Sequence, residues 1–197
     1  MISFFLLIAF SPLLIMTSVL SLLIQGLPIL FFHERLGKNG IPFTMVKFRT
    51  MKNGPSISAE HDITRLTYWG RILRKTSIDE LPVLFNVLKG NMSLVGPRPL
   101  PIKYFSRFNS FQKQRMNIKP GVTGLAQIHG RNNLSWEERF NYDIEYIQKA
   151  SFIFDLYIIF MTIFLVIFFK NVDGKNQEIM TEFMGSSIAN KKNQNQL

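Results

Sequence analysis

Cysteine is absent from the 197-residue sequence, which excludes a disulfide-stabilised scaffold and a cysteine-ligated metal site. The three histidines, His33, His61 and His129, do not have the spacing of metal ligands. The sequence also contains neither the phosphate-binding loop motif nor the glycine-rich dinucleotide fingerprint. The most recognisable metal and nucleotide signatures are therefore missing, and function has to be sought in other patterns.

Charged side chains are missing from residues 1–32 and are concentrated in the middle of the chain. Residues 33–150 carry 19 Lys and Arg against 9 Asp and Glu, a net charge of +10, whereas residues 151–197 carry 4 of each sign. Hydrophobic residues make up 47% of the chain, so the bulk of the chain is not disordered. A basic region between apolar segments suits an anionic bilayer surface or polyphosphate substrates held near one, with nucleic acid as the alternative polyanion.

The uncharged segment 1–32 is long enough to cross a membrane, for which about 20 apolar residues suffice. It has neither the basic start nor the small-residue cleavage site of a signal peptide. Pro12 favours a kink, and each arm would rise roughly 16 Å, about half the hydrocarbon thickness. The helix would then either span the bilayer with a kink or enter and return to the same side. The residues alone favour the kinked span, because prolines are common in spanning helices.

Two further segments have the character of membrane or core helices. Residues 152–169 form an apolar run in which Ser151, Asp155 and Thr162 would share one helical face as a thin polar stripe. This helix would span the membrane, lie in its interface or pack into the protein, and its length does not decide between these. Residues 104–119 are predicted to form an amphipathic helix, whose aromatic residues suit a protein core and a membrane interface equally.

The basic middle of the chain has several local signals. Residues 43–51 are predicted to be a strand and residues 64–75 a basic helix. Farther along, Pro97 and Pro99 restrict the backbone on both sides of Arg98. A pre-organised arginine suits a phosphate site, because its guanidinium can hold two oxygens at low entropic cost. The alternative is a rigid turn that carries an incidental surface arginine.

The tetrapeptide Ser77-Ile78-Asp79-Glu80 has both a structural and a functional interpretation. Ser77 with Glu80 three residues later is the pattern of a capping box, although Pro82 would prefer a helix that starts slightly later. The functional interpretation is that two adjacent carboxylates near arginines stay ionised, available as nucleophile or metal ligand. The tetrapeptide alone favours the cap.

Seven stretches, taken in order, resemble the bacterial sugar transferase family, the monotopic phosphoglycosyl transferases, and above all its short members that hold only the catalytic domain, such as the diacetylbacillosamine-1-phosphate transferase. Each motif is weak alone, but the ordered set covers nearly the whole chain and is highly specific. The stretches are Ser11-Pro12, Lys47-Phe48-Arg49-Thr50-Met51, Arg74 with residues 77–82, residues 85–90, residues 92–99, residues 119–124 and Gly130-Arg131-Asn132.

The resemblance implies that Asp79 attacks the sugar-linked phosphate of a UDP-sugar, that UMP leaves, and that a polyprenol phosphate then takes the phospho-sugar. The expected polyprenol is undecaprenyl phosphate. Glu80 would assist proton transfer or orient the acceptor. Mg²⁺ would lie between Asp79 and the diphosphate, which matches its usual ligands of few carboxylates, phosphate oxygens and water. Arg74, Arg98 and Arg131 would bind the phosphates or the nucleotide.

The resemblance also implies a mainly helical α+β fold with a re-entrant N-terminal membrane helix, interfacial amphipathic helices and a small β-hairpin or sheet. The re-entrant helix replaces the kinked span. The expected divisions are the re-entrant helix over 1–32, a basic cytosolic catalytic domain over 33–150, an apolar interfacial helix over 151–170 and a tail over 171–197. Family members usually begin with a basic segment, so the start of this sequence indicates a truncated N-terminus or a misassigned start.

The implied location is the cytosolic face of the bacterial inner membrane, with membrane lipids as partners, no nucleic acid and a homodimer left open. The rival hypothesis is a non-enzymatic, membrane-anchored protein that binds polyanions. The rigid turn at Arg98 and the Asp79–Glu80 pair argue against it, because a purely electrostatic binder needs neither.

Overall fold

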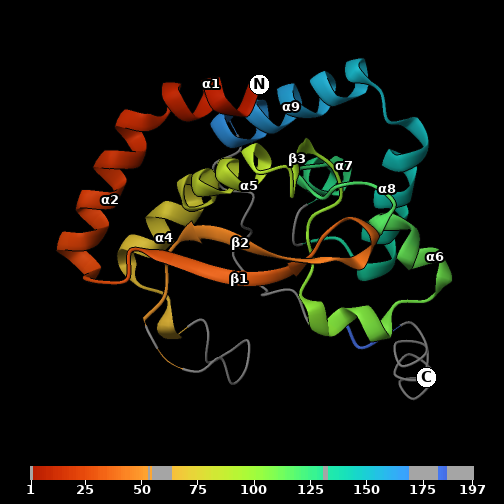
Figure 1. Cartoon of the computed structure of the whole chain (residues 1–197), viewed down its shortest axis with the longest axis horizontal. Helices are drawn as coiled ribbons and strands as arrows, with labels where there is room; N and C mark the ends of the chain where they lie inside the picture. The colour runs from red at the N-terminus through yellow and green to blue at the C-terminus, as the bar shows by residue number, and fades with distance from the viewer. Residues whose placement is uncertain (1, 53, 55–63, 131–132, 169–181, 186–197) are drawn as a thin grey trace.

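The structure is a computed structural model that describes residues 2–52, 54, 64–130, 133–168 and 182–185. Helices predominate among these residues, and the strands form two small two-stranded sheets. Figure 1 shows a β-hairpin below a layer of helices, with further helices covering its right-hand end. The predicted mainly helical α+β fold is confirmed.

The chain begins with two helices, α1 (Ile2–Ala9) and α2 (Ser11–Gln25), which meet at an angle of 56°. The break is where Pro12 predicted it, and the Ser11 hydroxyl donates to the carbonyl of Ile8 at 2.8 Å, which satisfies a backbone group near the break. Among the described residues no single helix is long and apolar enough to cross a membrane, whereas this bent pair meets the length and composition requirement together.

The hairpin consists of β1 (Leu30–Leu36) and β2 (Pro42–Phe48), which pair antiparallel and are joined by the 3-10 turn η1 (Lys38–Gly40). The predicted strand over 43–51 is confirmed, although it ends at Phe48. Strand β1 was not predicted, and because α2 ends at Gln25, the segment 1–32 contains a helical pair, a turn and the start of β1.

The C-terminal end of α2 is hydrogen-bonded to the segment that follows β2 and to α4. The guanidinium of Arg49 donates to the carbonyls of Gln25 and Gly26, where the helix dipole favours a cation. On the next element, α4 (Tyr68–Lys75), the indole of Trp69 donates to the Ser21 hydroxyl at 2.9 Å. The hydrogen bond from Trp69 orients α4 against α2. The predicted basic helix over 64–75 is confirmed for residues 68–75, which form α4.

After α4 come the 3-10 helix η2 (Ile78–Val83) and the short helix α5 (Leu84–Leu88). Helix η2 packs on β2, and α5 packs against α1. The amide of Asn86 binds the exposed edge of β2, accepting from Val46 N at 3.1 Å and donating to Thr44 O at 2.7 Å. The hairpin and η2 are thereby held in a fixed relation.

A second sheet consists of β3 (Ser93–Val95) and β4 (Gly121–Thr123), which run parallel. The strands approach closely, since a Cβ atom on Gly121 would lie 2.1 Å from the Gly96 backbone nitrogen. Helices α7 (Leu125–His129), α8 (Trp136–Lys149) and α9 (Phe152–Phe168) follow. This sheet brings the Arg98 loop next to the 119–124 turn.

The prediction of one amphipathic helix over 104–119 is wrong. The segment is divided into η3 (Ile102–Arg107), α6 (Ser110–Lys113) and η4 (Gln114–Met116). Asn109 ends the first piece, because its side chain accepts from the Gln112 backbone N–H at 2.8 Å in a new capping box. Two of the predicted aromatic stripe residues are buried in the protein core rather than at an interface, namely Tyr104 and Phe108.

The polar stripe predicted for the last apolar helix is confirmed, and it faces the protein. Asp155 accepts a hydrogen bond from the Tyr146 hydroxyl at 2.7 Å, and Thr162 bonds to Thr123 at 2.7 Å. Ile158 lies on the same side and is fully buried. Helix α9 therefore packs along the domain, on β3, β4 and α7.

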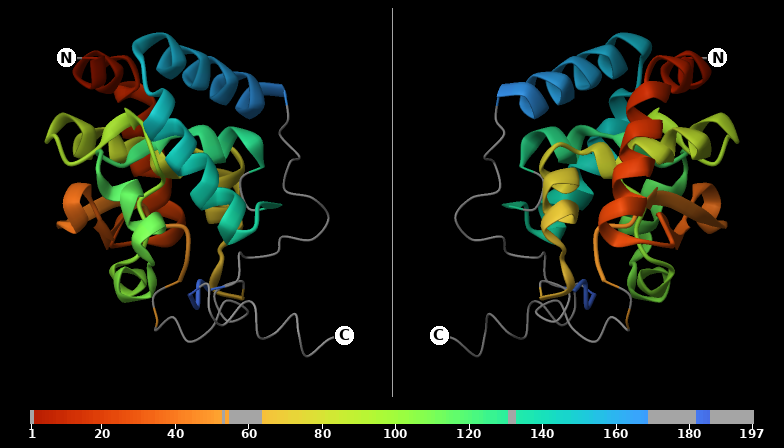
Figure 2. Two further views of the ribbon diagram at one scale, coloured as in Figure 1. Left: turned by 90° about the vertical axis from the view of Figure 1, so that its right-hand side faces the viewer. Right: turned by 90° about the vertical axis from the view of Figure 1, so that its left-hand side faces the viewer.

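The opposite side of α9 belongs to a large exposed apolar surface. Helices α1 and α9 lie along the same face of the molecule in all three views (Figures 1 and 2). Exposed apolar side chains of this size mark a surface that contacts a membrane or another protein. The residues concerned on α1, α2, α5 and α9 include Ile2, Phe4, Phe5, Ile8, Leu23, Ile24, Phe85, Leu88, Phe152, Ile153, Phe160, Ile163, Ile167 and Phe168.

Candidate active site

The two carboxylates of the Ser77–Glu80 tetrapeptide lie on η2, and the predicted capping box is wrong. Ser77 adopts a left-handed conformation with φ 58°, and its side chain makes no capping hydrogen bond. The backbone therefore turns sharply out of α4 before η2 begins. Neither Asp79 nor Glu80 is used to cap a helix, which leaves both side chains for the site.

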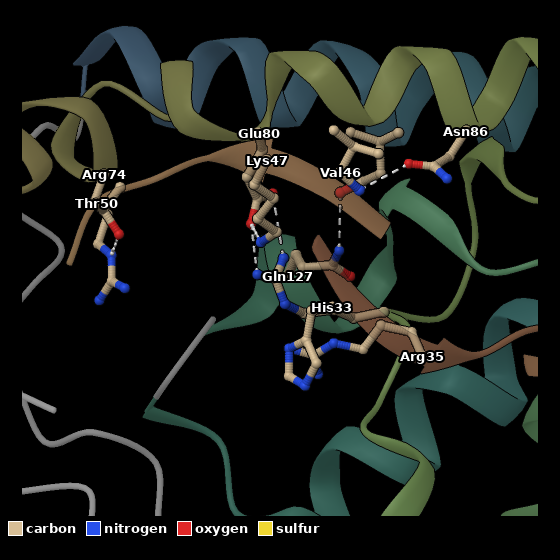
Figure 3. Close-up of polar contacts among 11 residues, drawn as sticks. His33, Arg35, Val46, Lys47, Thr50, Arg74, Glu80, Asn86 and Gln127 are labelled. Carbon is tan, nitrogen blue, oxygen red and sulfur yellow. Dashed lines mark hydrogen bonds and ion pairs between the residues drawn. The ribbon is translucent and has the colours of Figure 1, made fainter. Parts of the chain in front are cut away.

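Glu80 is held by two cations from different parts of the fold. Lys47 of β2 contacts its Oε1 at 2.5 Å, and Arg98 donates to Oε1 at 2.6 Å and to Oε2 at 3.4 Å (Figure 3). Burial alone would raise the pKa of the Glu80 carboxyl, but Arg98 and Lys47 hold it well below its usual range. A carboxylate so firmly ionised is a poor proton acceptor near neutral pH. In this structure Glu80 is the counter-ion of Lys47 and Arg98, and its role in proton transfer or in orienting the acceptor stays a prediction.

Asp79 has the opposite environment. Its side chain is only 8% exposed, and within the described part of the chain it has no hydrogen-bond or ion-pair partner. Burial, followed by repulsion from Glu80, raises the pKa of Asp79 to about 6, against the opposing effect of Lys47, Arg74 and Arg98. Burial thus outweighs the nearby cations in setting the pKa of Asp79. Asp79 is still mainly ionised at neutral pH, and its oxygens are free to attack or to bind a metal.

The environments of these adjacent carboxylates push their pKa values apart. Such a separation assigns different roles to two acids in one site. The neutralised member, Glu80, fixes the surrounding cations. The unpaired member, Asp79, is the group whose protonation state and lone pairs are available for chemistry.

Arg74 and Arg98 both belong to the site, but they are held differently. Arg74, in the last turn of α4, donates from Nε to the Thr50 hydroxyl at 3.1 Å, and its terminal nitrogens have no partner among the described residues (Figure 3). The Arg98 backbone carbonyl accepts from Arg115 at 2.7 Å. Arg115 is itself locked by Asp143 in a buried ion pair of 2.7 Å. Arg98 is therefore pre-organised, as its flanking prolines predicted.

Arg131, the third predicted phosphate ligand, lies outside the described residues. Sequence reasoning also missed two groups near Glu80, His33 and Arg35, because it did not predict β1. Arg35 donates to His33 Nδ1 at 2.9 Å (Figure 3). Burial and the charge of Arg35 lower the pKa of His33 to about 4, so the ring is neutral. Burial and Arg98 lower the pKa of Arg35 to about 10, which leaves it charged. The aromatic pair Phe31–Phe32 ahead of the glycine-bounded turn Gly37–Gly40 was the available sign of a strand.

Gln127 on α7 adds a neutral group beside these cations (Figure 3). Its side-chain nitrogen donates to the Val122 carbonyl at 3.3 Å. Its Oε1 is buried and accepts no hydrogen bond within the described part of the chain. A buried acceptor without a partner is costly, so the atom is suited to an N–H or O–H group of a ligand.

The number of available carboxylates decides whether the site fits Mg²⁺. No group of three or more His, Asp and Glu side chains is close enough to hold a metal ion among the described residues. Mg²⁺ needs only one or two carboxylates when substrate phosphates and water complete its octahedron. Because Lys47 and Arg98 already occupy Glu80, Asp79 is the carboxylate that fits this role.

The site thus combines an unpaired carboxylate with several nearby cations, on a domain with exposed apolar helices. The chain belongs to the bacterial sugar transferase family, whose sequence profile matches residues 1–169. It is therefore a transferase. The resemblance in the sequence motifs is confirmed.

Relatives of known name support this assignment. The chain is 43% identical over 184 residues to the uncharacterized sugar transferase EpsL of Bacillus subtilis (strain 168), which covers 92% of this chain and 91% of that protein. It is 38% identical over 157 residues to the undecaprenyl-phosphate galactose phosphotransferase of Salmonella typhimurium, covering 70% of this chain and 33% of that protein. It is 38% identical over 175 residues to the UDP-glucose:undecaprenyl-phosphate glucose-1-phosphate transferase of Klebsiella pneumoniae, covering 83% and 38%. The chain thus spans about a third of the length of the latter two.

Proposed function

We propose that this protein transfers a sugar-1-phosphate from a UDP-sugar to a polyprenol phosphate, with undecaprenyl phosphate as the expected acceptor. The products are UMP and a polyprenol-diphospho-sugar, the first membrane step of glycoconjugate assembly. The observation that carries the proposal is the division of roles within one dyad: Asp79 is unpaired, while Glu80 is neutralised by Lys47 and Arg98. The printed activities of the Salmonella and Klebsiella relatives support the reaction class.

In the first step an Asp79 oxygen attacks the sugar-linked phosphorus of the UDP-sugar. The bond between that phosphorus and the oxygen of the UMP phosphate breaks, and UMP leaves with the electron pair. Arg74 and Arg98 bind the phosphate oxygens. Arg74 lies in the last turn of α4 and Arg98 in the loop after β3, so their guanidinium groups reach the site from different elements. In this reaction class catalysis consists mainly of positioning and charge neutralisation.

In the second step an oxygen of the polyprenol phosphate attacks the same phosphorus, and the bond to Asp79 breaks. The carboxylate is regenerated, so the reaction balances without a further reactant. A nucleophile that is ionised at neutral pH needs no general base, which agrees with a Glu80 that is already neutralised by ion pairs. The covalent intermediate means that the soluble nucleotide and the lipid need not occupy the site together.

Mg²⁺ is the proposed cofactor, held by Asp79 and the substrate diphosphate, where it would neutralise negative charge that Asp79 must approach. Gln127 is suited to bind a hydroxyl or imide N–H of the donor through its unpaired oxygen.

We place the enzyme on the cytosolic face of the bacterial inner membrane. The exposed apolar surface of α1, α2 and α9 supports insertion into one leaflet. The net charge of +10 on the middle segment supports contact with anionic headgroups and anionic substrates.

The test is release of UMP from a panel of UDP-sugars by the purified protein in detergent or nanodiscs, with undecaprenyl phosphate and Mg²⁺. We expect turnover with at least one sugar and none with the Asp79→Asn variant. Binding of all polyanions alike, with a steep salt dependence and no UMP from any donor, would instead establish the rival, non-enzymatic role.

A further inference from the structure

The segment 182–185, the short blue segment of Figure 1, packs against residues that lie about 75 positions earlier in the sequence. Phe183 is only 4% exposed. Its ring is surrounded by four aromatic rings at centroid distances of 5.2 to 5.8 Å, which is the range of favourable aromatic packing. The four residues, here called the aromatic cage, are Tyr104, Phe108, Trp136 and Phe140.

Glu182 is recognised separately at the rim of the aromatic cage. Its carboxylate pairs with Arg107 at 2.7 Å and with Lys103 at 2.9 Å. Arg107 also donates to the backbone carbonyl of Phe183 at 2.5 Å. The acidic residue Glu182 is therefore bound by two cations, and the aromatic residue Phe183 that follows it is packed against four rings. The sequence profile of the family ends at residue 169, before this segment.

The aromatic cage shares its walls with the loop that carries Arg98. Leu100 packs in the same buried cluster as Phe183, and its carbonyl accepts from Leu36 N at 2.9 Å. On the other side, the guanidinium of Arg115 lies 5.8 Å from the Phe140 ring while holding the Arg98 carbonyl. Phe183 therefore packs in one cluster with Leu100, two residues after Arg98, and with Phe140, whose ring lies beside Arg115.

We propose that the aromatic cage and its basic rim are a binding site for an acidic–aromatic peptide, occupied by this chain's own residues 182–185, and that its occupation positions Arg98 for the donor diphosphate. Phe183 and Glu182 are positioning residues, since neither touches the reacting groups. This inference rests on the proposed function. It predicts that the tail affects donor affinity more than the covalent chemistry of Asp79.

The test compares two truncations, deletion of 182–197 and deletion of 186–197, the second being the matched control that keeps the docked segment. We expect the control to keep wild-type constants. We expect the longer deletion to raise the KM for the UDP-sugar about tenfold, the effect of misplacing one charged hydrogen-bond donor, with a smaller change in kcat. A synthetic peptide of residues 181–186 added in trans should restore the KM, whereas the same peptide with alanine in place of Phe183 should not.

Point variants keep the test decisive if the deletion does not fold. Phe183→Leu retains an apolar side chain, Glu182→Gln acts at the exposed rim, and Met184→Ala is the control at a neighbouring side chain that is 53% exposed. The first two should raise the KM and the third should not. Unchanged donor KM in both Phe183→Leu and Glu182→Gln, or a folded deletion that the peptide leaves unaffected, would overturn the proposal.

The proposed function can fail independently of this inference. Absence of UMP release by the full chain would reject the transferase, and peptide docking would then be followed by the fluorescence of Trp136, which lies 5.3 Å from Phe183. A peptide that leaves the emission of the 182–197 deletion unchanged would reject the binding site itself.

Discussion

Replacing Asp79 by asparagine should inactivate the enzyme and at the same time stabilise its fold. Burial and the neighbouring Glu80 raise the pKa of Asp79 from its ordinary value of 3.8 to about 6. At 1.36 kcal/mol for each pKa unit, this difference corresponds to about 3 kcal/mol of destabilisation by the ionised carboxylate at neutral pH. A neutral side chain of the same shape removes that cost. The free energy of unfolding should therefore rise by up to about 3 kcal/mol. For a chain of this size each kcal/mol raises the Tm by roughly 2–4 °C.

The effect should depend on pH with a defined sign. The folded protein keeps the Asp79 proton to a higher pH than the unfolded chain does, so the wild type loses stability as the pH rises from about 4 to about 6. The difference between Asp79→Asn and the wild type should be small near pH 4 and complete above pH 7. Thermal or denaturant unfolding in detergent at both pH values measures it.

Asp143→Asn is the matched control, because Asp143 is also a buried aspartate but, unlike Asp79, has an ion-pair partner in the described residues. Asp143 neutralises the buried Arg115 at 2.7 Å, so removing its charge leaves an unpaired buried cation and should cost about 3–5 kcal/mol. The reasoning would be refuted if Asp79→Asn were less stable than the wild type at pH 7.5, or if its advantage were the same at both pH values.

Three further outcomes follow from the site and the surface. The kcat/KM of the wild type should fall tenfold per pH unit below about pH 6 as Asp79 takes up its proton. Glu80→Gln should lower activity and move this limb to lower pH, because the repulsion from Glu80 that raises the pKa of Asp79 is removed; an unmoved limb would show that Asp79 is not the group that titrates. Arg98→Lys should raise the KM for the UDP-sugar about tenfold, because lysine keeps the charge but lacks the two-pronged guanidinium; equal constants would remove Arg98 from phosphate binding. Phe160→Glu, on the exposed side of α9, should weaken vesicle binding in flotation assays, and unchanged flotation would show that this face does not touch lipid.

Signals that depend on one or two neighbouring residues could be read from the sequence. Pro12 marked the bend between α1 and α2, because a proline disrupts a helix wherever it lies. The stripe of Asp155 and Thr162 marked the inner side of α9, because polar side chains on an apolar helix seek partners in the protein. Pro97 and Pro99 marked the rigid loop that presents Arg98.

Features that depend on distant contacts could not be read in the same way. The Ser77–Glu80 pattern predicts a capping box, but the side chain of Glu80 is taken by Lys47 and Arg98, which are 33 and 18 residues away in sequence. The local helical spacing over 104–119 was real, yet Asn109 formed its own capping box and divided the helix. Strand β1 was hidden because its first residues continue the apolar run of α2.

The electrostatics of the dyad could not be predicted for the same reason. Adjacent residues have similar local sequences, so the sequence treats Asp79 and Glu80 alike. Their different pKa values come from burial and from which of the two carboxylates the hairpin and the Arg98 loop reach. The residues therefore identified the two acids, the family resemblance implied their roles, and the tertiary structure shows how their environments differ.

Mass spectrometry of the enzyme after incubation with a UDP-sugar and Mg²⁺, without a polyprenol acceptor, tests the central claim most directly. The account predicts a phospho-sugar adduct on the peptide that contains Asp79, formed in proportion to the UMP released in a single turnover and discharged when undecaprenyl phosphate is added. UMP released without any modification of Asp79 would contradict it.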